Sequence, residues 1–163
     1  SRGPIVGVGA DKEPIDNGLW ESARTFLARH LSKESMDDQN RRTQIWDIPS
    51  EALREAVVNA LVHRDYLLSA TTIEISIYVD RVEIVSPGRL PNGINPDRMR
   101  IGCRAARNQL LKDTMRDYGY MEHMGMGIPR KIVRLMHEHN GTEPDLLVGE
   151  EQFTMVLWRT PRA

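Results

Sequence analysis

Apolar residues recur at helical spacing in four segments of the chain and alternate with polar residues in shorter segments between them. The predicted helices span 17–31, 50–66, 105–118 and 128–139. The predicted strands span 41–48, 72–79, 82–85 and 153–158. The polar stretch 32–40 is expected to be a loop. This order predicts an α+β fold, a two-layer sandwich whose mainly antiparallel or mixed sheet is covered by helices on one face.

The clearest strand signal lies in 72–79, which we expect to form a hairpin with 82–85. Isoleucine or valine occupies every second position from Ile73 to Val79, which predicts one buried face. Asp80 and Arg81 form the expected tight turn. Residues 86–93 contain two prolines and two glycines, so we expect an irregular loop, a common place for binding residues.

The helix expected at 50–66 carries a polar stripe beside its core face. At 100° per residue, the core face comprises Leu53, Ala56, Val57, Ala60 and Leu61. Glu55, Asn59 and His63 follow one another at intervals of four residues, so they stack along one side of the helix. A carboxylate and an amide with hydrophobic residues on both sides cost free energy unless a partner satisfies them. The stripe is therefore a candidate site.

The composition is that of one ordinary globular domain. The chain has 163 residues, 40% of them hydrophobic, and its formal net charge of −1 predicts no basic field for a nucleic-acid backbone. Cys103 is the only cysteine, which excludes an internal disulfide and suits a reducing compartment. Nothing resembles a signal peptide, and no apolar run has membrane-spanning length. We therefore expect a cytoplasmic protein without a membrane partner.

We expect residues 17–163 to form a single domain. Residues 1–16 are rich in glycine, proline and charge, which is typical of a linker or a frayed N-terminus. Because the chain begins without methionine, we interpret it as a fragment of a longer protein.

Three features together indicate a nucleotide bound with magnesium: the helix with the acid and the amide, the Gly/Pro loop after a strand, and a Gly-x-Gly at the start of a helix. Gly125 and Gly127 come just before a predicted helix, where backbone N–H groups and close approach suit a phosphate. Asn59 offers a neutral oxygen to Mg²⁺, which keeps most of its waters and the phosphates of the ligand. Glu55, one turn earlier, is placed to accept a proton from a water near those phosphates. No Gly-x₄-Gly-Lys-Ser/Thr sequence occurs, so no P-loop motor is predicted.

Three segments carry a family resemblance. They are 55–66 (Glu-Ala-Val-Val-Asn-Ala-Leu-Val-His-Arg-Asp-Tyr), 82–91 (Val-Glu-Ile-Val-Ser-Pro-Gly-Arg-Leu-Pro) and 125–135 (Gly-Met-Gly-Ile-Pro-Arg-Lys-Ile-Val-Arg-Leu). They resemble the N box and the two glycine boxes of the Bergerat-fold (GHKL) ATP-binding superfamily of gyrase B, MutL and histidine kinases. The chain is most similar to the branch found on the C-terminal side of AlbA-like, Schlafen-type transcriptional regulators, often labelled "RecG-like helicase C-terminal".

The resemblance implies that the chain binds ATP or a related purine nucleotide together with Mg²⁺. By the same match, Glu55 is the general base and Asn59 is the Mg²⁺ ligand in the nucleotide complex. The other residues assigned to nucleotide binding are His63, Ser86, Gly88, Gly125 and Gly127.

Three positions depart from the pattern of the superfamily. Ser86 aligns with the aspartate that hydrogen-bonds the adenine amino group, and Leu90 replaces the second glycine of the first box. Pro129 stands where the second box usually has another glycine, and it removes one N–H that a phosphate would otherwise meet. The contacts to base and phosphates are therefore expected to differ from those of the superfamily.

The sequence leaves three functions open. The leading hypothesis is a nucleotide-sensing regulatory domain of a transcriptional regulator, which couples ligand state to a DNA-binding module outside this chain or to a homodimer partner. The second is an active ATPase with Glu55 as general base. The third is a nucleotide-free dimerisation or scaffold domain, in which Asn59 braces a loop and His63 closes the helix end.

Overall fold

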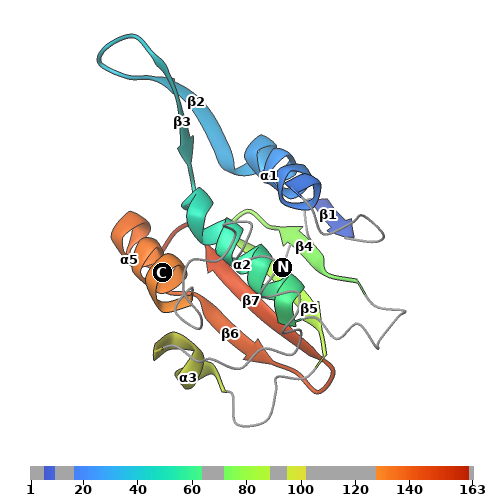
Figure 1. Cartoon of the computed structure of the whole chain (residues 1–163). Coiled ribbons are helices and arrows are strands. Elements are labelled where there is room, and N and C mark those ends of the chain that lie inside the picture. The colour runs from blue at the N-terminus through green and yellow to red at the C-terminus, as the bar shows by residue number, and fades with distance from the viewer. Residues whose placement is uncertain (1–5, 10–16, 64–71, 89–94, 102–127, 162–163) are drawn as a thin grey trace.

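The computed structural model describes residues 6–9, 17–63, 72–88, 95–101 and 128–161 (Figure 1). In this part of the chain, the main sheet is antiparallel with strand order β1-β4-β5-β7-β6, and a separate two-stranded sheet pairs β2 with β3. The strands are β1 (Val6–Gly9), β2 (Ser32–Met36), β3 (Arg42–Trp46), β4 (Glu74–Ile77), β5 (Arg81–Pro87), β6 (Asp145–Val148) and β7 (Gln152–Trp158).

The helices form the second layer. They are α1 (Asn17–Leu31), α2 (Ser50–His63), α3 (Pro96–Ile101), the π-helical segment η1 (Ile128–Val133) and α5 (Arg134–Asn140). Helix α2 lies across the middle strands of the main sheet and packs against β5 and η1 (Figure 1). The predicted α+β two-layer sandwich is confirmed. Within the described ranges, no helix is both long and apolar enough to cross a membrane.

The hydrophobic core lies between the main sheet and α2. Ile73, Ile75 and Ile77 are buried, as their alternation predicts. The predicted core face of α2 is also buried throughout: Leu53, Ala56, Val57, Ala60 and Leu61. The expectation that Val79 shares the buried face of β4 is wrong, because Val79 is 62% exposed. The Tyr78 N–H donates to the Arg81 carbonyl at 2.8 Å, so Val79 lies in the turn that this bond closes.

Strand β7 holds the main sheet together because it pairs along its whole length with β5 and, over residues 153–156, with β6. The sequence did not predict β6. Only Leu146 is buried in this strand, whereas Leu147 and Val148 are 53% and 52% exposed, so no alternating pattern marks it. The turn into β7 at Gly149 was predicted, and there the Gly149 N–H donates to the Gln152 carbonyl at 2.8 Å.

Strand β5 is longer than the hydrophobic pattern indicates. Ser86 and Pro87, which we expected in a loop, pair in register with Phe153 and Gln152 of β7. A proline has no N–H for a ladder, and here it takes the last position of the strand, where that loss matters least. The loop was therefore predicted to begin two residues too early.

The remaining elements follow the predictions in part. The helix expected at 128–139 is present as η1 followed by α5, and it ends as predicted at Gly141, whose φ is 71°. Strand β1 lies within residues 1–16, on the edge of the main sheet beside β4. The helix expected at 105–118 falls outside the described residues.

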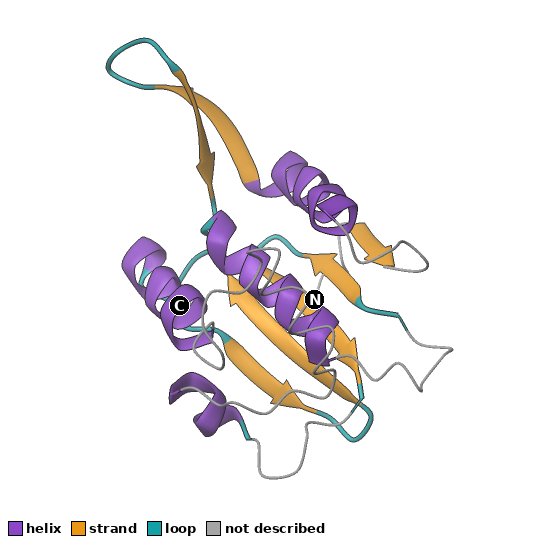
Figure 2. Cartoon of the chain, in the orientation of Figure 1, coloured by secondary structure: helices purple, strands orange, loops and turns teal. Residues whose placement is uncertain are grey.

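Residues 32–46 form a hairpin, which we call the arm, where the sequence predicts a loop followed by one strand. The strand at 42–46 is confirmed, but the prediction of a loop over 32–40 is wrong, because β2 occupies its first five residues. Figure 2 shows the arm projecting from the body of the domain beyond α1. Most residues of its strands are exposed, and none is buried. A strand without a buried face has no hydrophobic alternation, which explains the missed prediction.

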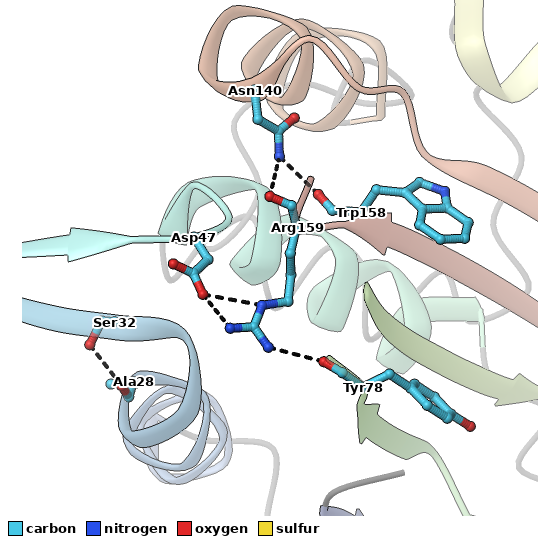
Figure 3. A network of polar contacts seen from close by, with 7 residues as sticks. All are labelled: Ala28, Ser32, Asp47, Tyr78, Asn140, Trp158 and Arg159. Atoms are coloured by element: carbon cyan, nitrogen blue, oxygen red, sulfur yellow. Dashed lines mark hydrogen bonds and ion pairs between the residues drawn. The ribbon is translucent and has the colours of Figure 1, made fainter. Parts of the chain in front are cut away.

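Arg159, which follows β7, ties distant segments together (Figure 3). Its Nε donates to Asp47 Oδ2 at 3.1 Å, its Nη2 contacts the same oxygen, and its Nη1 donates to the Tyr78 carbonyl at 3.0 Å. From α5, Asn140 Nδ2 donates to the main-chain carbonyls of Trp158 and Arg159 at 2.9 and 3.3 Å. The base of the arm, the turn after β4, the end of α5 and the last strand thus meet at one point.

Replacement of Arg159 by alanine is expected to lower the free energy of unfolding by about 2 kcal/mol, because charged hydrogen bonds are lost at partly buried groups. The side chains of Arg159 and Asp47 are only 19% and 29% exposed. Arg134→Ala is the matched control. It removes an exposed ion pair to Glu138 at 3.6 Å, so its effect should stay within about 0.5 kcal/mol. Urea denaturation followed by circular dichroism measures both. Equal losses in the two variants would contradict the role given to Arg159.

Candidate functional site

Glu55 and Asn59 lie one turn apart on α2, and the three residues between them are buried. Glu55 is 8% exposed, and the adjoining Ala56, Val57 and Val58 are 1%, 3% and 1% exposed. Asn59 Nδ2 donates to the main-chain carbonyl of Glu55 at 2.7 Å and to its carboxylate Oε1 at 2.9 Å. The helical spacing therefore brings together the two side chains that the sequence singles out, and the amide supplies a donor to the buried carboxylate.

These two hydrogen bonds fix the orientation of the Asn59 amide. Both partners are acceptors, so the NH₂ group faces Glu55 and Oδ1 faces away from it. No described residue donates to Oδ1. A neutral amide oxygen at a half-buried position is a ligand that Mg²⁺ accepts alongside water and phosphate. Asn59 thus fits the role of a cation ligand, and Glu55 is the residue that orients it.

Ser86 joins the end of β5 to the last turn of α2. The residue is 3% exposed, and its Oγ donates to the main-chain carbonyl of Ala60 at 3.1 Å. Carbonyls in the last turn of a helix lack intrahelical partners, so a side-chain donor stabilises the helix end. The structure places Ser86 beside the residue that follows Asn59. The hydroxyl oxygen still has lone pairs with which it can accept a hydrogen bond.

Gly88 follows β5 in a conformation that favours glycine. Its φ is 104°, and its N–H donates to the Glu151 carbonyl at 2.8 Å. This N–H is therefore used within the fold, at the turn that leads into β7. The assignment of Gly88 to nucleotide binding stays a prediction.

The other predicted site residues are described only in part or not at all. His63 is the last residue of α2, and its side chain lies outside the described residues, as do Gly125 and Gly127. The helix that follows these glycines is described: η1 packs beside α2, and Lys131 Nζ lies 3.3 Å from Glu51 Oε2. The segment after the second glycine box is thus adjacent to the helix that carries Glu55 and Asn59.

Two main-chain groups beside Ser86 and Gly88 were not predicted from the sequence. They are the carbonyls of Ala60 and Glu151, which accept the hydrogen bonds from Ser86 and Gly88. Main-chain acceptors exist at every residue, so the sequence carries no signal that distinguishes these two. Their partners depend on the register of β5 against β7 and on the packing of α2 over β5.

The antiparallel sheet, covered by a helix that carries Glu55 and Asn59, makes this an α+β domain, and a family match supports an ATPase-like domain. Residues 70–157 match the family described as "Putative ATP-dependent DNA helicase recG C-terminal", and the chain belongs to this family. The matched segment contains Ser86 and Gly88 and begins after Glu55 and Asn59.

A solved structure supports the fold assignment over more of the chain. The DIP2311 protein from Corynebacterium diphtheriae is similar to this chain, with a TM-score of 0.69 and 25% sequence identity over 86% of the present chain. The chain spans 28% of the length of that protein. No curated protein matches the sequence.

Ser86→Ala is expected to lower the free energy of unfolding by about 1–2 kcal/mol, because the Ala60 carbonyl loses a buried donor. Ser76→Ala is the control, since Ser76 is a half-buried serine on the neighbouring strand β4 and should change stability by less than about 0.5 kcal/mol. Thermal and urea unfolding of both variants check the difference. If Ser86→Ala proved as stable as Ser76→Ala, the bond to α2 would contribute nothing.

Proposed function

We propose that this domain binds ATP or a related purine nucleotide with Mg²⁺, in the manner of the Bergerat (GHKL) superfamily. The nucleotide would lie between α2, the end of β5 and the glycines at 125–127. One observation carries the proposal: Asn59 is held by Glu55 so that its amide oxygen faces away from the pair. Membership of an ATPase-like family supports it independently.

The roles of the two residues follow from this geometry. Asn59 Oδ1 would take one ligand position of Mg²⁺, whose charge neutralises phosphate oxygens when the nucleotide is bound. The Glu55 carboxylate orients the amide and lies one turn away, where it can accept a proton from a water. His63, Ser86 and Gly88 are proposed to contact the nucleotide at the end of α2 and β5.

We further propose a regulatory role for nucleotide binding in a longer cytoplasmic protein. The solved relative has a much longer chain, of which the present chain covers 28%. The family description refers to a DNA helicase, although this sequence has no P-loop. We therefore expect contact with DNA to belong to a module outside this chain, as in a transcriptional regulator. The state of the nucleotide would then bias how that module is held.

A nucleotide-free scaffold is the second candidate. It is favoured by the internal use of two predicted contact groups, because the Ser86 hydroxyl donates to Ala60 and the Gly88 N–H donates to Glu151. In this candidate the Glu55–Asn59 pair only stabilises α2. An active ATPase, the third hypothesis, requires Glu55 to act as a base on water.

Isothermal calorimetry with Mg-ATP distinguishes these functions. We expect the wild-type chain to bind, and Asn59→Ala to bind at least about tenfold more weakly, because a ligand of the cation is lost. Removal of Mg²⁺ with EDTA should weaken ATP binding by the wild type more than ATP binding by Asn59→Ala. Gln39→Ala, which truncates an exposed amide on the arm, is the matched control and should bind like the wild type.

If the wild-type chain bound no purine nucleotide, the proposal would be contradicted and the nucleotide-free scaffold would remain. Glu55→Gln then separates a sensor from an ATPase, because glutamine keeps an oxygen acceptor for Asn59 Nδ2 but cannot take up a proton. Phosphate release by the wild type that disappears in Glu55→Gln, with binding retained, would establish the ATPase.

A further inference from the structure

The arm has no part in the proposed nucleotide site, yet it is an ordered structure. At its tip, Asp37 Oδ1 accepts hydrogen bonds from the backbone N–H groups of Gln39 and Arg41 at 2.9 and 2.8 Å. Asp37 Oδ2 accepts a hydrogen bond from Arg41 Nε at 2.9 Å. The pKa of the Asp37 carboxyl is lowered, and the largest cause is the hydrogen bond from the backbone N–H of Arg41. Asn40 adopts a left-handed conformation, with φ of 59°, which closes the turn.

The base of the arm is attached firmly to the domain. Ser32 Oγ donates to the Ala28 carbonyl of α1 at 2.7 Å, and the Asp47 N–H donates to the Leu31 carbonyl at 2.7 Å. The Asp47 carboxylate is held by Arg159. Trp46 packs against the core of the body. The arm is therefore attached to the domain at its base, and the hydrogen bonds of Asp37 hold the turn at its tip. The two strands between bury no residue.

Such a hairpin is poorly stabilised by itself. A two-stranded hairpin by itself is at best marginally stable in water, and independent stability requires three or more strands with a hydrophobic face or packing against a helix. The arm also exposes large apolar side chains, since Met36 is 57% and Ile45 55% exposed. An unpaired edge with exposed apolar side chains is a template on which a further strand can pair.

The register of the hairpin shows which backbone groups such a strand would meet. The bonds from Asp47 N–H to Leu31 and from Asp37 N–H to Arg41 mark hydrogen-bonded pairs at the two ends of the ladder. Hydrogen-bonded and non-hydrogen-bonded pairs alternate in an antiparallel ladder. It follows that the residues whose N–H and C=O groups point away from the hairpin are Arg42, Gln44 and Trp46 on β3, and Ser32, Glu34 and Met36 on β2.

We propose that β3 pairs with β3 of a second copy of this chain, antiparallel about a two-fold axis at Gln44. This pairing brings Gln44 opposite the partner's Gln44, and Arg42 opposite the partner's Trp46. All three outward residues of each strand then form hydrogen-bonded pairs, and the two arms become one four-stranded sheet. An identical patch on both copies is what a two-fold interface requires.

The charges favour this edge and this partner. Like charges directly opposite each other are destabilising, and self-pairing of β2 about its centre would put Glu34 against the partner's Glu34. Self-pairing of β3 opposes no like charges, and it places the Arg42 guanidinium against the indole of the partner's Trp46. The arm is electrically balanced, with Lys33, Arg41 and Arg42 against Glu34, Asp37 and Asp38, so a nucleic-acid groove is not its complement.

Charge exchange at Gln44 tests the interface. Sedimentation velocity of the wild-type chain, from roughly 1 µM to 1 mM, should show a reversible dimer. Gln44→Lys alone should raise the dimer dissociation constant by about fivefold or more, because like charges meet at the axis. Gln44→Glu should do the same, but it also opposes Glu34 within its own arm, so the lysine variant decides between the outcomes. An equimolar mixture of the two variants should recover association to at least the wild-type level.

Glu34→Gln and Glu34→Lys are the matched controls, since residue 34 holds the equivalent position on the other edge. Both should dimerise like the wild type. A wild-type chain that stays monomeric over the whole range would overturn the proposal. So would a dimer that is insensitive to the Gln44 variants, or one that is weakened by the Glu34 variants. None of these readouts involves nucleotide, so they stand apart from the calorimetric test of the proposed function.

Discussion

The contact between the buried Glu55 carboxylate and the half-buried Asn59 amide is the constraint on which this domain depends. Glu55 lies beside buried apolar residues of α2, so its carboxylate, at 8% exposure, requires hydrogen-bond donors within the fold. Asn59 supplies one at 2.9 Å from the next turn, which leaves its own oxygen directed elsewhere. The same contact thus supplies a donor to the buried carboxylate and leaves the amide oxygen of Asn59 for the proposed cation. Stability and the proposed chemistry share one pair of side chains.

The rest of the fold positions this pair. The last turn of α2 is fixed to β5 by the hydroxyl of Ser86, and β5 is fixed in register by its full length of pairing with β7. Gly88 then turns the chain where its N–H meets Glu151. At the opposite end of the sheet, Arg159 holds the base of the arm against the strand ends. The main sheet therefore holds both α2 and the arm, although the proposed partner of α2 is a nucleotide and that of the arm is a second copy of the chain.

Hydrophobic periodicity predicted the elements that bury a face, and it missed those that do not. The isoleucines of β4 and the core stripe of α2 appear where expected, because burial selects the side chains at those positions. Strands β2 and β6 were missed because they owe their structure to backbone pairing with a neighbour, which leaves little trace in side-chain pattern. Spacing alone predicted that Glu55 and Asn59 meet. The partners of Ser86 and Gly88 are main-chain carbonyls, so only the folded register determines them.

The central claim is that the Asn59 oxygen binds the cation of a nucleotide complex, and paramagnetic NMR tests it most directly. With Mn²⁺ in place of Mg²⁺, addition of ATP should broaden the side-chain amide signal of Asn59 strongly, while that of Gln44 on the arm stays sharp. Mn²⁺ without ATP should have little effect, because most ligands of the cation come from phosphates and water. If Asn59 stayed sharp in the presence of Mn-ATP while other residues broadened, or if no residue broadened at all, the claim would be contradicted.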